Sequence, residues 1–284
     1  MNRACYFYRV VFWGMVLMGS CSGLYAVSRL EQVFLQAAQS GNEESLKNVF
    51  DRFEGSFDPN VQFNPDKDGF NALHFAALQG HNNLIDLLVK NGVNINATDA
   101  VGRTPLYLAV IKQFPDTVRV LLEHGANVNI GDKEGDGKGR SPLLIAVAEK
   151  NIEIVQLLRG HGAQVYGFKN KEGNNAFHLA AYESNPKMAD ALLKQYRVPK
   201  GQPEENMAVA FSQKNNKGDT PVIVAAKMQK SKDFYDLFAH YANTVLPSHT
   251  ASPWERYKGE QPPSYYQEPM VVVQHNTDAL VSAS

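Results

Sequence analysis

Apolar and polar positions in the middle of the chain recur with a period of 33 residues. The stretch 66–98, DKDGFNALHFAALQGHNNLIDLLVKNGVNINAT, is followed at once by a second version at 99–131, DAVGRTPLYLAVIKQFPDTVRVLLEHGANVNIG. In each version a segment containing a pair of small residues precedes a segment whose apolar residues have helical spacing. The small pairs are Ala76-Ala77, Ala109-Val110, Ala146-Val147, Ala180-Ala181 and Ala225-Ala226, and the spaced pairs are Ile85 and Leu88, Val118 and Leu121, Val155 and Leu158, and Ala189 and Leu192. This period predicts stacked two-helix units, because one unit cannot bury its own apolar face.

Each unit also places a Gly two residues before a residue that is typical of a helix N-cap. These pairs are Gly69/Asn71, Gly102/Thr104, Gly139/Ser141, Gly173/Asn175 and Gly218/Thr220. Gly suits a tight turn, and the side-chain oxygen of Asn, Thr or Ser accepts from an unpaired amide of the first helical turn. Three units then have Pro at the first helical position, namely Pro105, Pro142 and Pro221. The pattern predicts that the first helix of each unit begins directly after the cap.

The Gly-x-cap turn, the small pair and the second apolar segment together resemble the ankyrin repeat from residue 66 to 246, and a degenerate copy precedes them. The resemblance implies an all-α solenoid of stacked helix-turn-helix units with connecting β-hairpin loops. It also implies that hairpin tips and a concave helix face bind a partner protein. By alignment, the contact positions are Lys67, Asp68, Ala100, Val101, Asp136, Lys138, Lys171 and Glu172 at hairpin tips, and Leu78, Gln79, Ile111, Lys112, Glu149, Tyr182 and Glu183 on first helices.

The same pattern divides the chain into eight segments. They are a signal peptide at 1–26, a degenerate N-terminal capping repeat with connector at 28–65, repeats at 66–98, 99–131 and 132–169, a repeat with an inserted loop at 170–213, a C-terminal capping repeat at 214–246, and a Pro-containing disordered tail at 247–284. A polar outer face is expected of the terminal repeats, since no neighbour covers them.

The N-terminal segment has the pattern of an export signal. Arg3 and Arg9 precede the short apolar run 10–18, and small residues lead to Cys21. The run is shorter than the roughly 20 residues that span a bilayer. The residues before Cys21 resemble the lipobox of bacterial lipoproteins, which implies lipidation of Cys21 as the new N-terminus. The alternative is cleavage further on, for example after Ala26, which would give a periplasmic or secreted protein.

Composition narrows the function classes. The 284 residues carry a net charge of -1 with 20% charged residues, so no clustered basic surface indicates a nucleic-acid partner. The only cysteines are Cys5 and Cys21, which leaves the mature body without a disulfide. No nucleophile-base constellation, phosphate loop or dinucleotide fingerprint stands at usable spacing. We therefore expect a monomeric, non-enzymatic protein without cofactors, attached to a membrane only through its signal or lipid anchor.

Two groups of residues invite a metal site. His74, His81, His124, His161 and His178 follow the repeat period, which favours structural hydrogen bonding over a zinc site. The segment 132–137, DKEGDG, looks like the first half of a calcium loop, but Leu143 stands where that loop needs a bidentate Glu. A polar hairpin extension is the better interpretation.

Two functional hypotheses follow. The first is an exported, lipid-anchored scaffold that binds a partner protein, and the alternative is a regulatory or inhibitory module of a periplasmic or host enzyme. In the tail, Pro262, Pro263 and Tyr265 match the PPxY pattern that WW domains read in polyproline II conformation. This candidate ligand motif matters only inside a eukaryotic host.

Overall fold

The computed structural model describes residues 21–53, 57–63, 69–133, 139–193 and 207–228, and they form helices joined by turns. The helices are α2 (Cys21–Ser40), α3 (Glu43–Arg52), α4 (Ala72–Gln79), α5 (Asn82–Lys90), α6 (Pro105–Ile111), α7 (Pro115–Glu123), α8 (Pro142–Ala148), α9 (Ile152–Gly160), α10 (Ala176–Glu183), α11 (Pro186–Leu193), α12 (Met207–Ser212) and α13 (Pro221–Met228). Within these ranges β-pairing is limited to an isolated bridge between Phe63 and Phe70. The expectation of an all-α chain is confirmed.

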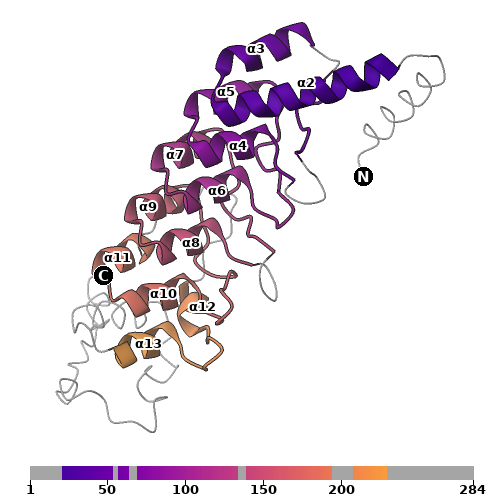
Figure 1. The fold of residues 1–284 in the computed structure, drawn as a ribbon. Helices are drawn as coiled ribbons and strands as arrows, with labels where there is room; N and C mark the ends of the chain where they lie inside the picture. The colour runs from indigo at the N-terminus through magenta and orange to yellow at the C-terminus, as the bar shows by residue number, and fades with distance from the viewer. Residues whose placement is uncertain (1–20, 54–56, 64–68, 134–138, 194–206, 229–284) are drawn as a thin grey trace, which may run out of the picture.

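The helices are arranged in two layers that run along one axis (Figure 1). The first helices α4, α6, α8, α10 and α13 pack in series, and the second helices α5, α7, α9 and α11 pack in series behind them. The helix pair α2 and α3 covers the end formed by α4 and α5. The turns that join one pair to the next extend sideways from the N-terminal ends of the first helices. This is the predicted solenoid.

Side-chain caps start the first helices as the sequence predicts. Thr104 Oγ1 accepts from the Tyr107 amide at 3.2 Å, and Ser141 Oγ accepts from the Leu144 amide at the same distance. Asn71, Asn175 and Thr220 cap their helices in the same manner. Each cap satisfies one amide that the helix itself leaves unpaired.

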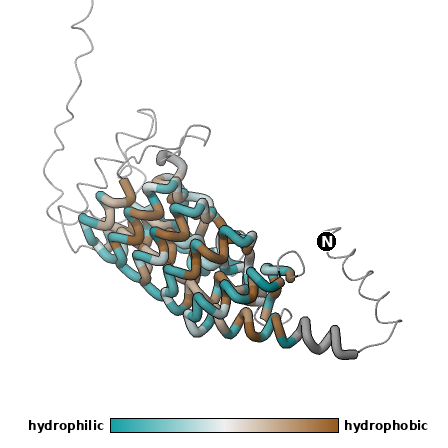
Figure 2. Tube along the Cα trace, turned by 90° about the horizontal axis from the view of Figure 1, so that it is seen from above, coloured by the Kyte–Doolittle hydropathy of each residue, from teal (hydrophilic) through white to brown (hydrophobic). Residues whose placement is uncertain are grey.

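The core lies between the two layers and is continuous along the stack. All eight apolar residues of the predicted second-helix pairs, from Ile85 to Leu192, are completely buried. The small pair Ala76-Ala77 is also completely buried, as are Ala180 and Ala181, so neighbouring first helices approach closely there. Figure 2 shows the hydrophobic positions recurring at matching places along successive helices. Burial of this shared apolar surface holds the units together.

The turn between the two helices of a unit needs a left-handed backbone. Gly41 and Gly80 meet this requirement with φ of 77° and 73°. The later units place Gln113, Lys150 and Ser184 there, with φ of 57°, 61° and 50°. A non-glycine residue pays a steric cost of roughly 1 kcal/mol in this conformation. The side chains of Gln113 and Lys150 contact the next unit, through Glu149 at 3.1 Å and Glu183 at 2.7 Å.

The N-terminal pair begins earlier than the sequence predicted. The degenerate repeat was expected from residue 28, whereas α2 begins at Cys21 and overlaps the last six residues of the predicted 1–26 signal segment. Among residues 29–40 of α2, whose burial the structure describes, Phe34 is the first buried one, and its ring meets those of Phe50 and Phe57 at centroid distances of 5.4 and 4.7 Å. The connector after α3 therefore contacts this helix pair at Phe57.

The inserted stretch before the last unit contains a helix where the sequence predicted a loop. Helix α12 is short, and its Phe211 stacks on Phe177 of α10 with ring centroids 4.5 Å apart. Both rings are almost completely buried. The apolar residues of the segment 207–211 are too few to show a helical period, and they form a helix because Phe211 is buried against α10. The end of the inserted stretch therefore adds to the apolar core of the stack.

Helix α12 also supplies partners for a buried cap. Asn175 Nδ2 donates to Ala210 O at 2.9 Å and to Gln213 Oε1 at 3.0 Å. The equivalent Nδ2 of Asn71 is buried and has no partner among the described residues. We expect Asn175→Thr to lower the free energy of unfolding by about 1–3 kcal/mol, because two hydrogen bonds are lost while the cap is kept.

The matched control is Asn71→Thr, which keeps a cap and removes an amide without a partner. Its unfolding free energy should stay within about 0.5 kcal/mol of the parent or rise. Urea denaturation followed by circular dichroism measures both variants. Equal losses at the two positions would show that the contacts to α12 add no stability.

Candidate protein-binding surface

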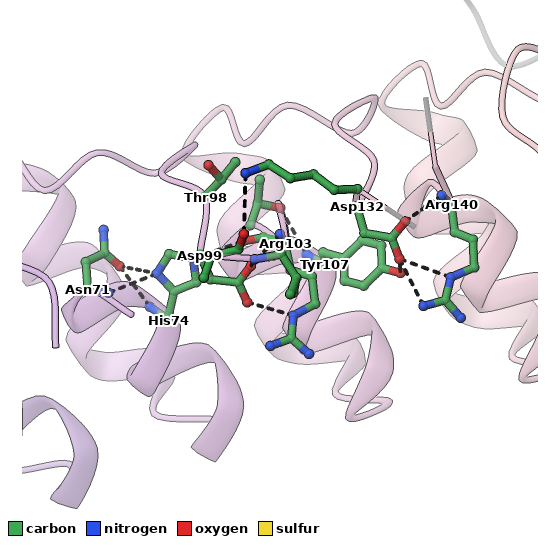
Figure 3. A network of polar contacts seen from close by, with 12 residues as sticks. Asn71, His74, Thr98, Asp99, Arg103, Tyr107, Asp132 and Arg140 are labelled. Carbon is green, nitrogen blue, oxygen red and sulfur yellow. Dashed lines mark hydrogen bonds and ion pairs between the residues drawn. The ribbon is translucent and has the colours of Figure 1, made fainter. Parts of the chain in front are cut away.

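From Asp99 onward, an acidic or amide side chain organises the described turns between units. Asp99 Oδ1 accepts from the amides of Val101 and Arg103 at 3.0 and 2.7 Å, and Asp99 Oδ2 accepts from Arg103 Nε at 2.6 Å (Figure 3). Asn170 and Asn215 hold the later turns through the same backbone amides, two and four residues on. The side chain thereby closes the hairpin without a β-ladder.

The second of these turns is linked to the preceding unit through a buried network. Asp132 accepts from the amide of Arg140 at 2.8 Å and from its Nη2 at 2.9 Å, and the Tyr107 hydroxyl donates to the same carboxylate. The Asp132 side chain is 1% exposed, whereas that of Arg140 is 33% exposed. Figure 3 shows Tyr107, from α6, pointing at Asp132 from one side and Arg140 from the other. The contact joins two units through side chains.

Neighbouring hairpins are also bonded to each other. The amide of Lys133 donates to Val101 O at 2.8 Å, and that of Asn216 donates to Glu172 O at 3.0 Å. A ladder of side-chain amides runs beside the second helices: Asn94 N donates to Asn60 Oδ1, Asn127 N to Asn96 Oδ1, and Gln164 N to Asn129 Oδ1. Within each of the two bonded pairs, the described parts of the turns are therefore held relative to one another, which leaves less to order on binding.

The histidines are structural, as the sequence indicated. The Asn71 amide donates to His74 Nδ1 at 3.1 Å, and His74 Nε2 donates to Arg103 O at 3.0 Å. His178 makes the equivalent bonds with Asn175 and with Asp219 O. The ring of His81 contacts Gln39 O, that of His161 contacts Leu157 O, and that of His124 lies 3.5 Å from Asp86. The described residues contain no group of three or more His, Cys, Asp or Glu that could hold a metal ion.

Burial lowers the pKa of His74 and of His178 from 6.5 to about 4, because the charged ring would lose its hydration. The unfolded chain then binds more protons than the folded chain between pH 6.5 and 4. The free energy of unfolding should therefore fall as the pH is lowered through this window and should be independent of these rings above pH 7. Denaturation with urea at each pH measures the slope.

His74→Gln and His178→Gln separate the two contributions. Each variant should flatten the pH dependence between pH 6.5 and 4, and the double variant should flatten it most, because Gln does not titrate. If the double variant kept the same slope of unfolding free energy against pH, the two rings could not be neutral groups held by two hydrogen bonds each.

The predicted contact positions fall into three groups. Ala100, Val101, Lys171 and Glu172 are exposed on the turns, and Gln79, Ile111, Lys112, Glu149 and Glu183 are exposed at the ends of first helices. Leu78 and Tyr182 are partly buried. Lys67, Asp68, Asp136, Lys138 and the PPxY residues Pro262, Pro263 and Tyr265 lie outside the described residues. Cys21 is the first residue of α2.

The structure adds an aromatic group that the sequence did not single out as a site. The Phe75 ring lies 6.1 Å from that of Phe63 and 5.6 Å from that of Phe70, and Arg103 stands 5.9 Å over the Phe70 ring. Phe63 is 46% exposed. Its place before the first full unit, outside the repeat register, explains why alignment did not find it.

None of the helices formed by the described residues combines the length and the apolar character needed to cross a bilayer.

The comparisons with known proteins agree with the fold. A family profile described as "Ankyrin repeats (3 copies)" matches residues 34–132 and 131–202, which is more than half of the 284 residues. The chain therefore belongs to the ankyrin-repeat family. Proteins of this class serve as protein-protein interaction scaffolds and are generally non-enzymatic.

Similar proteins match through part of the repeats. Mouse protein phosphatase 1 regulatory subunit 27 is 40% identical over 68 residues, which is 24% of this chain and 44% of that protein. Alpha-latrotoxin-Lg1a of Latrodectus geometricus is 33% identical over 106 residues, or 37% of this chain and 7% of the toxin. Human Rabankyrin-5 is 36% identical over 70 residues, or 24% of this chain and 6% of that protein. The chain spans less than half the length of each of them.

Proposed function

We propose that this protein is a monomeric scaffold that binds one partner protein on the surface formed by its first helices and hairpins, after export and lipidation at Cys21. The observation that supports binding is the row of hairpins that extends from the N-terminal ends of the first helices, whose opposite ends carry exposed residues. Exposed positions such as Val101 and Ile111, at 47% and 37% exposure, supply apolar contact area on that surface. Bound protein partners typically cover about 800 Å² on each side.

The proposed anchor agrees with the position of Cys21 in the fold. Processing before Cys21 would retain every residue of α2 as the structure describes it, Cys21–Ser40. Cleavage after Ala26 would remove the first six residues of α2 and none of the buried residues that α2 contributes from Phe34 onward. Either mature form would keep the stack, so the two differ in attachment to a membrane and not in fold.

The intact mass of the natively expressed protein distinguishes the forms. A mass that begins at Cys21 and includes acyl groups supports the lipid anchor, and a mass that begins near Val27 supports a periplasmic or secreted protein. Cys21→Ser should release the protein from the membrane fraction in the first case. An unprocessed chain in the cytosol would contradict export altogether.

Binding needs a separate test. A photoreactive amino acid placed at position 111 should crosslink a protein in the native compartment, whereas the same group at position 187, on the exposed second-helix side, should not. The crosslinked partner is then purified and its affinity for the isolated full chain is measured. Equal crosslinking at the two positions would contradict a defined binding surface.

A second candidate function is regulation of an enzyme by occlusion. It is favoured by the similarity to a protein named as a phosphatase regulatory subunit, at 40% identity over 68 residues. If the crosslinked partner is an enzyme, adding the purified chain should change its activity in proportion to the bound fraction. If the enzyme binds but its activity does not change, the scaffold function is supported and regulation of the enzyme is excluded.

A further inference from the structure

One apolar position repeats on the exposed end of successive first helices. Seven residues after each cap stand Leu78, Ile111, Ala148 and Tyr182, from α4, α6, α8 and α10. Ile111 and Ala148 are exposed, and the other two are partly exposed. Because these helices pack in series (Figure 1), the four positions lie in a row along the solenoid, here called the inner stripe.

A basic ridge runs parallel to the inner stripe on the hairpins. It consists of Lys133, Lys169, Lys214 and Lys217, all of them exposed. Lys169 and Lys214 each precede the Asn that organises their turn, so they occupy equivalent positions in adjacent units. The hydrogen bond from Asn216 N to Glu172 O, at 3.0 Å, holds these two turns together.

The acidic side chains near the basic ridge do not neutralise its positive charge. Asp132 and Asp219 are buried and form ion pairs. Asp132 pairs with Arg140 at 2.9 Å, and Asp219 pairs with Lys227 at 2.9 Å. Among the described hairpin residues, Glu172 is the one exposed acidic side chain. On the far side of the inner stripe, Glu183 pairs with Lys150 at 2.7 Å and Glu149 accepts from Gln113 at 3.1 Å. The exposed Lys112 also lies on that side, next to Ile111. The surface is thus apolar along one line, with lysines along the hairpin edge and charges of both signs along the other edge.

We infer that this surface binds an amphipathic α-helix whose apolar seam lies on the inner stripe and whose acidic flank faces the basic ridge. This inference rests on the proposed function and names the chemistry of the partner. Packed helices are about 8–10 Å apart, and seven residues of an α-helix rise about 10.5 Å, so one heptad of the partner advances by nearly one unit of the stack.

The other shapes of partner fit less well. In an extended strand, successive side chains point to opposite faces, so half of them would leave the stripe. A nucleic acid would use the basic ridge but would gain little from four apolar positions. An amphipathic helix presents an apolar seam and a charged flank side by side, which matches an apolar line with a basic edge.

The probe that tests this is a designed helical peptide of three heptads with Leu at the apolar seam and Glu along one flank. Its reference has Lys in place of each Glu. Fluorescence anisotropy with the full chain at about 0.05 and 0.5 M salt should show at least tenfold tighter binding of the Glu peptide at low salt and a smaller difference at high salt.

Three variants of the chain test which residues contact the peptide. Lys169→Glu combined with Lys214→Glu should remove or reverse the preference for the Glu peptide, and Ile111→Asp should weaken both peptides at least tenfold. Lys187→Glu, on the exposed side of α11, is the matched charge control and should change neither. Circular dichroism and melting confirm that each variant is folded.

Several results would overturn the inference. They are equal affinity for the two peptides, tighter binding of a proline-rich peptide of the same charge, or tight binding of single-stranded nucleic acid that Ile111→Asp does not weaken. If a native partner still crosslinks at position 111 while the peptides show no preference, the scaffold function stands and the helix chemistry fails. If neither occurs, both proposals fail.

Discussion

Replacing Leu121 with Ala should lower the free energy of unfolding by about 2–5 kcal/mol, since a completely buried side chain would leave a cavity between α7 and its neighbours. In a stack, each unit contacts only the units beside it. Hydrogen exchange should therefore increase most in α5, α7 and α9, and much less in α2. Urea denaturation gives the total loss, and exchange mass spectrometry gives its distribution.

The control for Leu121→Ala is Val101→Ala, at a hairpin position that is 47% exposed. Its backbone carbonyl still accepts from Lys133, so the unfolding free energy should change by no more than about 0.5 kcal/mol. Unchanged melting of Leu121→Ala would show that the second helices are aligned incorrectly. Equal exchange in every helix would show that the stack unfolds as one unit.

The sequence predicted the regular part of the fold because two independent signals agree there. The Gly-x-cap turns mark where first helices begin, and the apolar pairs of the second helices mark which side is buried. The cap residue Thr104 and the core residue Leu121 were both identified this way, and both are buried. Local conformational preference and packing specify the same structure at these positions. Their structure can therefore be predicted from a single sequence.

The departures occur where tertiary contact overrides local preference. Prolines at the start of the inserted stretch indicated a loop, yet Phe211 gains a completely buried partner in Phe177, and that gain stabilises helix α12. Likewise Gln113 and Lys150 adopt a left-handed conformation that their residue types do not favour. Their places could have been found by aligning them with Gly80, which does favour it.

The candidate surface was predicted only in outline. Alignment placed Val101 and Ile111 on the exposed side, and they are there. It did not show that Asp132 is engaged with Arg140 and Tyr107, because residues 25 apart in sequence meet only through the packing of two units. The charge that the hairpins present to solvent depends on which acidic side chains are buried in such ion pairs. Composition does not contain that information, so the surface charge could not be predicted from it.

Asp132→Ala should cost about 3 kcal/mol of unfolding free energy, because the buried carboxylate accepts several hydrogen bonds while the Arg140 side chain that remains is partly exposed to solvent. The variant loses the pairing with Arg140, the acceptor for the Tyr107 hydroxyl and the side chain that closes the turn. Asp132→Asn should cost less, about 1–3 kcal/mol, because Asn170 and Asn215 show that an amide closes the same turn in later units.

A double-mutant cycle of Asp132→Asn and Tyr107→Phe measures the link between the two units. We expect a coupling energy of about 0.5–3 kcal/mol, since the two side chains are in contact and buried. The exposed pair of Arg119 and Glu153, at 3.3 Å, is the control, and Arg119→Ala should cost less than about 1 kcal/mol. Additive losses at Tyr107 and Asp132 would mean that the turn is closed within its own unit. The link between the two hairpins would then depend on the backbone hydrogen bond from Lys133 N to Val101 O, without support from the Tyr107 side chain.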